Sequence, residues 1–113
     1  PEAPDPSDGF PASAPAGAFP RGASPCGALD MVGNVMEWCS DLFEEAAYSR
    51  YSKGDLAPPD SANPRVDPYH VARGGSWRTA PTRVIAAFRH RTPERAQESP
   101  TGYPDRGFRA VKD

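Results

Sequence analysis

The sequence has no apolar run long enough to cross a bilayer and no large excess of charge of one sign. Thirteen Lys and Arg residues stand against fifteen Asp and Glu residues, which gives a net charge of −2 at pH 7, and no basic block stands out. A membrane-spanning helix needs about 20 mostly apolar residues, and nucleic-acid-binding domains carry clustered positive charge. The composition therefore argues against a membrane protein and against a nucleic-acid partner.

Cysteine and histidine are both scarce. The chain has two cysteines, Cys26 and Cys39, and two histidines, His70 and His90. The two cysteines do not form a metal-binding spacing, and isolated histidines are more often hydrogen-bonding residues than metal ligands. A disulfide between Cys26 and Cys39 is one possibility, but Cys39 falls among apolar positions, where a buried free thiol is commoner. We therefore expect reduced thiols and a cytoplasmic protein, and no secretory signal pattern opens the chain.

Long regular elements are also disfavoured. Fifteen Pro and ten Gly make up roughly a fifth of the chain. Each Pro removes a backbone donor and each Gly adds entropy to the unfolded chain. Either a partly disordered chain or a loop-rich fold fits this composition. The eleven aromatic residues favour the loop-rich fold from about Phe10 onward, and residues 1–9 are predicted to be a flexible lead-in.

What the sequence does contain is a distinctive stretch, Leu29–Asp41, which reads LDMVGNVMEWCSD. Within eight residues it places the oxygen donors Asp30, Asn34 and Glu37 and a glycine, Gly33, that permits a tight turn. Apolar residues then recur at i, i+3, i+4, i+7, i+10 and i+11, a spacing that predicts one face of an amphipathic helix. These positions are Val32, Val35, Met36, Cys39, Leu42 and Phe43. The stretch therefore predicts an oxygen-rich turn that runs directly into a short helix.

The other segments are predicted to be short strands and loops. Phe10 and Phe19 are the expected anchors of an extended run up to Pro25, since residues before proline avoid the α region. An irregular helical turn is expected at 44–51 and a long surface loop at 52–68. Short strands are expected at 71–77, 84–91 and 107–111, with a proline-bearing loop at 92–105.

Three motifs carry a family resemblance. LDMVGNVMEWCSD, then RGGSW and then GFRAV occur in this order, and together they resemble the formylglycine-generating-enzyme (sulfatase-modifying factor) superfamily. The upstream run DGFPASAPAGAFPRGASPCGALDM is similar to that family's approach to its GNVWEW motif. The resemblance covers most of residues 7–113. It implies an α+β, C-type-lectin-like fold with little regular secondary structure.

The resemblance also implies that the domain is incomplete in this chain. Residues 10–113 correspond to the C-terminal part of such a domain, and its N-terminal helices and strands are not present. We therefore expect the N-terminal remainder of the domain, or another chain, to complete the fold. In bacteria, domains of this family are often joined to kinases, proteases or other signalling modules, or they serve as scaffolds that display ligand-binding residues.

The first candidate site is a calcium site on the central turn. Calcium takes about six to eight oxygens, and it mixes carboxylates with backbone carbonyls in a bent loop. From spacing alone, Asp30 and Glu37 are better interpreted as caps of the predicted helix, because acids near a helix N-terminus satisfy free N–H groups. The resemblance instead implies a calcium-binding loop, structural rather than catalytic, at Asp30, Gly33, Val35 and Glu37.

The second candidate is the active site of a formylglycine generator. In that family a pair of cysteines shortly after RGGS binds copper, and soft thiolates suit Cu(I). Here Thr79 stands about where the first cysteine would be, and no cysteine follows it. The chain cannot supply that copper site. A different branch of the superfamily, which makes ergothioneine, uses iron held by histidines from another domain, and such ligands would lie outside this sequence.

These observations predict a catalytically degenerate module that recognises a protein or small-molecule ligand and carries a structural calcium ion. The alternative is a non-haem iron or copper oxidoreductase whose metal ligands lie in sequence absent from this chain. Arg73, Arg89 and Arg109 are interpreted as structural, because guanidinium groups tie together unpaired carbonyls. Trp38 is expected in the core. The ligand contacts that the resemblance implies are Trp77, Arg78, Thr79 and Tyr103.

Overall fold

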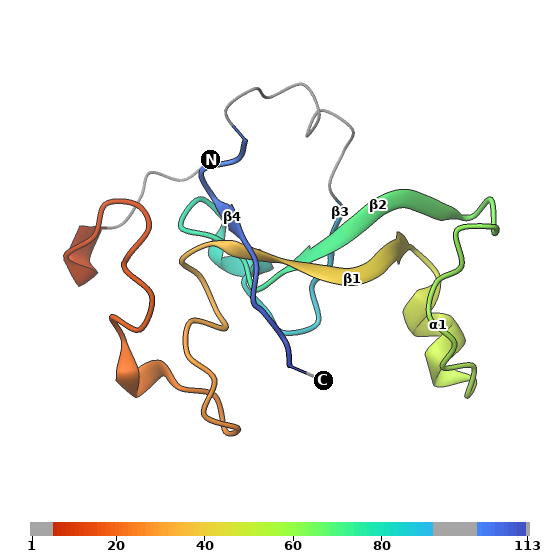
Figure 1. Cartoon of the computed structure of the whole chain (residues 1–113), viewed down its shortest axis with the longest axis horizontal. Helices are drawn as coiled ribbons and strands as arrows, with labels where there is room; N and C mark the ends of the chain where they lie inside the picture. The colour runs from red at the N-terminus through yellow and green to blue at the C-terminus, as the bar shows by residue number, and fades with distance from the viewer. Residues whose placement is uncertain (1–5, 92–101, 113) are drawn as a thin grey trace.

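The computed structural model of this chain describes residues 6–91 and 102–112. In these two ranges, four strands form one mixed sheet in the order β3-β2-β1-β4 (Figure 1). The pairs β1–β2 and β2–β3 are antiparallel, whereas β4 lies parallel to β1. The fold is therefore a small α+β arrangement around one sheet, as the sequence predicted. The strands are β1 (Met36–Glu44), β2 (Val66–Arg73), β3 (His90–Arg91) and β4 (Arg106–Gly107).

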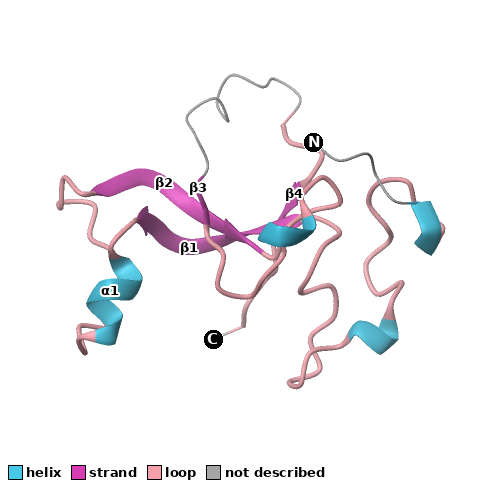
Figure 2. Cartoon of the chain, turned by 180° about the vertical axis from the view of Figure 1, so that it is seen from behind, coloured by secondary structure: helices cyan, strands magenta, loops and turns pink. Residues whose placement is uncertain are grey.

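Within the described residues, one α-helix and several short 3₁₀ turns accompany the sheet. The helix α1 (Ala47–Ser52) lies in the connection between β1 and β2, which confirms the helical turn expected at 44–51. Three 3₁₀ turns each contain a proline at their start, where the missing N–H is not needed. Figure 2 shows that most of the described chain is loop. The 3₁₀ turns are Pro6–Asp8, Pro20–Gly22 and Pro81–Arg83.

The helix predicted from Val32 to Phe43 is wrong, because this stretch forms a turn and then β1. Residues of β1 pair with β2 on one side and with β4 on the other. The pairing with β2 is interrupted by register shifts on both sides of Leu42. Between Trp38 and Leu42, β1 advances four residues while β2 advances two, and between Leu42 and Glu44 the reverse holds. The burial of β1 also fails to alternate, because Ser40 and Asp41 are both exposed. The resulting apolar spacing imitated a helical period although the backbone is extended.

The other predicted strands exist but differ in their bounds. The strand expected at 71–77 begins earlier, at Val66, and ends at Arg73, where the glycine turn starts. Of the strand expected at 84–91, only His90–Arg91 pairs with β2. The strand expected at 107–111 is the two-residue β4. Much of the loop expected at 92–105 lies outside the described residues, and so do residues 1–5 of the predicted lead-in.

A small apolar core is built from residues of β1, β2 and α1. Its buried hydrophobic side chains are those of alanine, valine and methionine. Trp38, expected in the core, is 38% exposed, and its ring stacks against the guanidinium of Arg106 at 5.4 Å. The core prediction for Trp38 is therefore wrong. The buried hydrophobic residues are Met36, Ala47, Val66, Val71 and Ala72.

Arginine side chains make side-chain and backbone hydrogen bonds around this core. Arg50 donates to both carboxylate oxygens of the buried Glu44, at 2.7 and 3.1 Å, and this pairing lowers the pKa of Glu44. Arg89 stacks on the Tyr48 ring at 4.2 Å and donates to the carbonyl of Glu44 at 2.6 Å. Arg73 donates to the carbonyl of Ala86. The predicted structural role of Arg73 and Arg89 is confirmed.

The N-terminal segment 6–35 lies beside the sheet at the end away from α1 (Figures 1 and 2). It contains no strand, so isolated polar contacts hold it. The side chain of Asn34 both accepts from the N–H of Ala14 at 2.8 Å and donates to its carbonyl at 3.2 Å. Phe10 and Phe19 meet edge to face with ring centroids 6.0 Å apart, which confirms them as anchors of this segment.

Candidate functional site

The central turn, residues 30–35, is strongly bent. Asp30, Gly33 and Asn34 have φ angles of 57°, 75° and 60°, in the left-handed region that glycine and asparagine tolerate best. The N–H of Gly33 donates to the carbonyl of Gly74 at 2.8 Å. The RGGSW loop after β2 therefore holds the turn in place. Because the turn leads into a strand, Asp30 and Glu37 cap no helix, and that interpretation is wrong.

Gly74 shows why this contact requires glycine. Its φ is +91°, and a Cβ atom at this position would lie 2.9 Å from the carbonyl oxygen of Met31. The N–H of Trp77 donates to the carbonyl of Asn34 at 2.9 Å, three residues further along. Two motifs that are far apart in the sequence are thus joined by backbone hydrogen bonds at a close approach.

The predicted calcium residues lie around this turn. The Glu37 carboxylate is held by Arg109, whose guanidinium donates to its two oxygens at 2.7 and 3.0 Å. Arg109 also donates to the carbonyl of Leu29 at 2.8 Å. The pKa of Arg109 is raised, first by the hydrogen bond with Glu37 and further by the charge of Asp30. The Glu37 carboxylate and the Leu29 carbonyl therefore both accept from one guanidinium, which confirms the structural role predicted for Arg109.

Asp30 makes a second contact that orients it. Its Oδ2 accepts from the N–H of Gly17 at 2.8 Å. Within residues 6–91 and 102–112, no three His, Cys, Asp or Glu side chains gather closely enough to hold a metal ion together. A calcium ion at this turn would therefore depend on backbone carbonyls as well as on Asp30 and Glu37, and the assignment of Gly33 and Val35 as carbonyl ligands stays a prediction.

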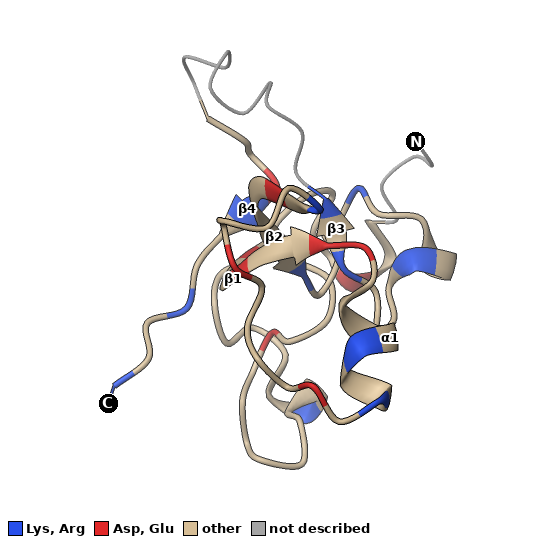
Figure 3. Ribbon diagram, turned by 90° about the vertical axis from the view of Figure 1, so that its right-hand side faces the viewer, with Lys and Arg blue, Asp and Glu red and all other residues tan. Residues whose placement is uncertain are grey.

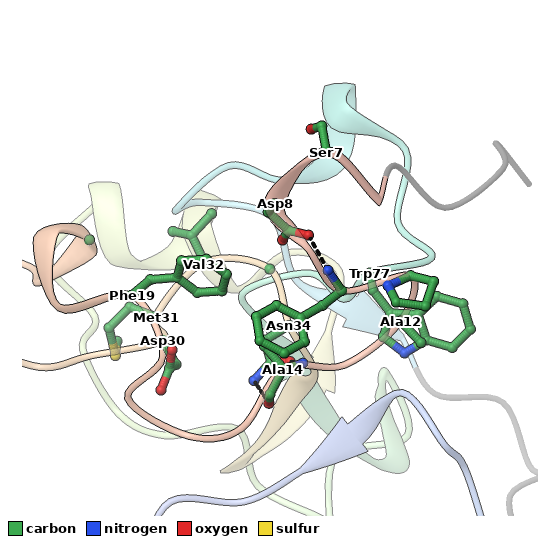
Figure 4. Close-up of a pocket in the computed structure, with 14 residues that line it drawn as sticks. Ser7, Asp8, Ala12, Ala14, Phe19, Asp30, Met31, Val32, Asn34 and Trp77 are labelled. Carbon is green, nitrogen blue, oxygen red and sulfur yellow. Dashed lines mark hydrogen bonds between the residues drawn. The ribbon is translucent and has the colours of Figure 1, made fainter.

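An open cavity of about 570 Å³ lies next to the turn. Figure 4 shows Asp30 and Met31 on one side of it and Trp77 on the other. Small-molecule sites are concave and mostly apolar, with volumes of about 300–1,000 Å³, so both the size and the lining are suitable for a ligand. Its larger side chains are Phe10, Phe19, Met31, Val32 and Trp77, with Asp8 and Asp30 as acids.

The structure brings together only some of the predicted ligand residues. Trp77 lines the cavity, and the exposed Arg78 lies over its ring with 5.4 Å between the guanidinium carbon and the ring centroid. Thr79 is turned toward Ser76, whose N–H it accepts at 2.8 Å. Tyr103 instead stacks on Arg106 at 4.7 Å. Trp77 and Arg78 thus form one group, while a ligand role for Thr79 and Tyr103 stays a prediction.

A polar cluster that the sequence did not reveal lies behind this loop. Ser76 is 3% exposed, and its hydroxyl donates to Asp105 Oδ2 at 3.3 Å and lies 3.2 Å from the Thr79 hydroxyl. The N–H of Arg78 donates to the same serine oxygen at 3.2 Å. Asp105 lies 29 residues after Ser76, so no local spacing could have linked them. The position expected for a first copper-binding cysteine is therefore occupied by a hydroxyl within a hydrogen-bonded network.

The two cysteines are free thiols in different surroundings. Cys26 is exposed in the N-terminal segment, and its sulfur lies 3.1 Å from the Ser24 hydroxyl, a contact that lowers the pKa of the thiol. Cys39 is half-buried on β1, and burial raises its pKa. Because the two thiols are unpaired, the disulfide considered from the sequence is absent from this structure.

The two histidines have separate structural contacts. His70 Nδ1 lies 3.0 Å from the carbonyl of Ser40 on the neighbouring strand. His90 packs edge to face on Phe88 at 4.6 Å, and burial lowers its pKa.

Across the ranges that the structure describes, no helix has the length and apolar character needed to cross a membrane.

Several known proteins are similar to this chain. It is 40% identical over 83 residues to a hercynine oxygenase of Mycolicibacterium thermoresistibile, which covers 68% of this chain and 18% of that protein. The hercynine oxygenase of Mycobacterium tuberculosis is 38% identical over 83 residues, with 68% and 17% covered. The serine/threonine-protein kinase Pkn1 of Chlamydia trachomatis is 37% identical over 87 residues, with 77% and 13% covered. The chain thus spans less than a fifth of the length of these relatives, and no solved structure matches it.

A family match covers nearly the whole chain. The sulfatase-modifying factor enzyme 1-like domain (FGE-sulfatase) matches residues 2–113. The match includes all three motifs that carry the resemblance, and the structure joins the first of them to each of the other two, through Gly33–Gly74 and through Glu37–Arg109. The chain therefore belongs to the family of sulfatase-modifying factor enzyme 1-like domains.

Proposed function

We propose that this chain is part of a catalytically degenerate module that recognises a ligand and is stabilised by a structural calcium ion. One observation carries this proposal. At the place where the resemblance predicts the first copper-binding cysteine, Thr79 is tied to the buried Ser76 and through it to Asp105. Hydroxyl groups are poor ligands for Cu(I) compared with thiolates. The loop is built for packing at this position rather than for copper chemistry.

The donor set at the turn supports the calcium ion. Asp30 and Glu37 would contribute carboxylates, and Gly33 and Val35 would contribute carbonyls, which are the oxygen types that calcium prefers. The same group already accepts a positive charge, since Arg109 bonds to Glu37 and to the Leu29 carbonyl. When bound, calcium would crosslink the bent turn to the start of β1 and would take no part in a reaction.

The cavity beside Trp77 is the proposed recognition site. Its aromatic walls and its acids at positions 8 and 30 suit a ligand with an apolar body and a polar or basic group. Arg78 stacked on Trp77 adds a cation at the rim. Aromatic and Arg residues are those that most often dominate binding energy at interfaces. Thr79 and Tyr103 belong to the proposed ligand face through the family resemblance alone.

We further propose that the domain has a C-type-lectin-like fold that is completed by residues outside this chain. Three large apolar side chains, Leu56, Phe108 and Val111, are 75%, 83% and 85% exposed. Apolar surface left in water lowers stability, and such surface commonly marks an interface. The N-terminal remainder of the domain, or a second chain, would cover it. The two free thiols suit a reducing, cytoplasmic location.

The alternative function is an iron- or copper-dependent oxidoreductase, and the two hercynine oxygenase relatives favour it. In this case the metal ligands would lie in the part of the protein that this chain does not contain. His70 Nδ1 lies against the Ser40 carbonyl, and the ring of the half-buried His90 packs on Phe88. The Trp77 cavity would then be one wall of an active site that is shared with the remainder of the protein.

Metal analysis of the intact protein separates the two functions. We expect calcium in a one-to-one ratio with the chain and no stoichiometric iron or copper after purification without chelator. Stoichiometric iron or copper that survives dialysis would overturn the degenerate module in favour of the oxidoreductase. A Trp77→Ala variant would be compared in parallel, because it should keep the calcium content and lose ligand binding only.

A further inference from the structure

A second cavity lies at the other end of the sheet, where β1 ends and β2 begins. Its volume is about 420 Å³, within the range of about 300–1,000 Å³ that is usual for small-molecule sites. Figure 3 views the molecule from this end, and positively and negatively charged residues are interspersed there. The lining residues are Phe43, Glu45, Arg65, Asp67 and Arg91.

Hydrogen bonds hold the backbone on both sides of this cavity. Glu45 directly follows β1 and Arg65 directly precedes β2, so both lie just beyond the last pair of the ladder. The guanidinium of Arg89 donates to the carbonyl of Glu45 at 3.2 Å. The N–H of Arg65 donates to Asn63 Oδ1 at 3.0 Å. The two charged side chains are therefore carried by backbone that is already fixed.

The charges of the lining are balanced, but only one pair of them is satisfied. Arg91 pairs with Asp67, and this hydrogen bond raises the pKa of Arg91, which the charge of Glu45 raises further. Within residues 6–91 and 102–112, neither the Glu45 carboxylate nor the Arg65 guanidinium makes a hydrogen bond or an ion pair. One acid and one base therefore face the cavity without pairing with each other.

The cavity also has an apolar wall. Phe43 is half-buried, and the guanidinium carbon of Arg89 lies 5.2 Å from the centroid of its ring. The same arginine donates to the carbonyl of Glu44 at 2.6 Å, so the cation that covers the ring is itself held. An apolar group that packs on this ring would gain free energy from the surface that it removes from water.

We propose that this cavity binds a free α-amino acid with an apolar side chain. The ligand carboxylate accepts from the guanidinium of Arg65, which can donate two parallel N–H bonds. The ligand ammonium donates to the Glu45 carboxylate, and the apolar side chain packs on Phe43. A zwitterion satisfies both unpaired groups and leaves the balanced charge of the lining unchanged, whereas a ligand of one sign satisfies only one of them. This site is independent of the Trp77 cavity and of calcium.

Calorimetric titration of the intact protein with L-leucine tests the ligand class. We expect saturable one-to-one binding near neutral pH. N-acetyl-L-leucine lacks the ammonium and L-leucinamide lacks the carboxylate, so each should bind at least about tenfold more weakly, because one charge of the cavity stays unpaired. Glycine should bind at least about fivefold more weakly than L-leucine, because it brings no side chain to Phe43. Absence of saturable L-leucine binding, or equal binding of L-leucine and its two derivatives, would overturn the proposal.

Variants assign the binding to this cavity. Glu45→Gln should weaken L-leucine binding at least about tenfold and leave N-acetyl-L-leucine binding nearly unchanged. Arg65→Gln should weaken L-leucine binding to a similar extent and leave L-leucinamide binding nearly unchanged. Arg21→Gln is the matched control, because Arg21 is equally exposed but lies in the 3₁₀ turn of the N-terminal segment. Equal affinity for L-leucine in Glu45→Gln, Arg65→Gln and Arg21→Gln would contradict the site.

Trp77→Ala separates this site from the proposed recognition site. It should lose the ligand of the Trp77 cavity and keep L-leucine binding, since Trp77 does not line the second cavity. Loss of L-leucine binding in Trp77→Ala would assign the amino acid to the Trp77 cavity and overturn the present inference.

Discussion

The strand pair β1–β2 and the N-terminal segment 6–35 are stabilised in different ways. The strand pair has a register of backbone partners and buries Met36, Val66, Val71 and Ala72. The N-terminal segment has no strand partner and depends on contacts such as Asn34–Ala14 and Asp30–Gly17. The stability of the strand pair is the sum of many small apolar contacts. In the N-terminal segment, each loop is instead held by a single polar group.

This difference predicts which substitutions destabilise the whole strand pair and which disturb only one loop. Loss of a buried apolar side chain weakens a packed unit whose parts depend on each other. Loss of one hydrogen-bonding side chain leaves a local group unsatisfied and frees one loop. The candidate site lies between the two regions, since its turn precedes β1 directly and its cavity is lined by the N-terminal segment and by Trp77 from the loop after β2.

The largest effect is expected for Met36→Ala in the strand pair. Met36 is 6% exposed, and truncation of a buried methionine costs about 2–5 kcal/mol because a cavity is left. Global unfolding in urea should shift to lower denaturant. Val111→Ala is the control, because Val111 is 85% exposed and its truncation should change the midpoint little. Equal shifts for the two variants would contradict the proposed core.

Removal of calcium is expected to have the next largest effect, and it acts on the turn. A ligand that is present at about a hundred times its dissociation constant stabilises the folded state by about 2.7 kcal/mol. Excess EGTA should therefore lower the melting temperature of the intact protein. Glu37→Ala should abolish this sensitivity to chelator. If the melting temperature is the same with and without EGTA, no calcium ion stabilises this turn.

Gly74→Ala tests the contact that joins the two regions. The new Cβ would lie 2.9 Å from the Met31 carbonyl oxygen at a φ of +91°, and we expect a loss of about 1–3 kcal/mol from strain and displacement. Gly54→Ala is a matched control, because Gly54 has a φ of +89° but a Cβ added there would meet nothing within 4 Å beyond its chain neighbours. The difference between the two in thermal unfolding isolates the steric part. Equal losses would show that the close approach is unimportant.

Asn34→Ala tests the polar contacts of the N-terminal segment, and it adds strain in the central turn because Asn34 has a φ of 60°. It removes the two hydrogen bonds to Ala14, at 2.8 and 3.2 Å, and we expect a loss of about 1–2 kcal/mol. Hydrogen exchange should become faster in residues 10–19 and change little in β2. Asn34→Asp, which can still accept from the N–H of Ala14, should restore part of the protection. A uniform increase in hydrogen exchange over both regions would contradict the idea that the two regions are stabilised separately.

The smallest effect concerns the chemistry of the two thiols. The hydrogen bond from Ser24 lowers the pKa of Cys26, whereas burial raises the pKa of Cys39. Because the thiolate is the nucleophile, iodoacetamide should alkylate Cys26 first at neutral pH. As the pH rises, the rate at Cys26 should level off before that at Cys39. Peptide mass spectrometry measures both rates, and Ser24→Ala should slow Cys26 only; faster labelling of Cys39 would contradict the assigned burial.

The sequence predicted the family motifs and the fold class better than the local structure. RGGSW and GFRAV each contain a residue whose contact crosses the fold, and those contacts are present through Gly74 and Arg109. The helix predicted at 32–43 is wrong because β1 lacks the alternation by which a strand is recognised: Ser40 and Asp41 are both exposed, and Leu42 and Phe43 are both half-buried. The strand at 84–91 is short because the chain turns before His90, with the N–H of Phe88 donating to the carbonyl of Ile85 at 3.1 Å.

Part of the candidate site could not be predicted, because its residues are far apart in the sequence and meet only in the folded chain. Ser76 and Asp105 are 29 residues apart, and Glu37 and Arg109 are 72 residues apart. No helical or strand period links residues at such separations. The cavity likewise combines Phe10 with Trp77, which only the folded chain brings together.

The parallel pairing of β4 with β1 has a consequence for synthesis and for truncation. Met36 and Glu37 find their partners at Arg106 and Gly107, so one side of β1 stays unpaired until nearly all of these residues have left the ribosome. An unpaired strand edge can recruit strands from other molecules. Proteins that lack the segment from β4 onward should therefore be found in inclusion bodies more often than those shortened before Phe10.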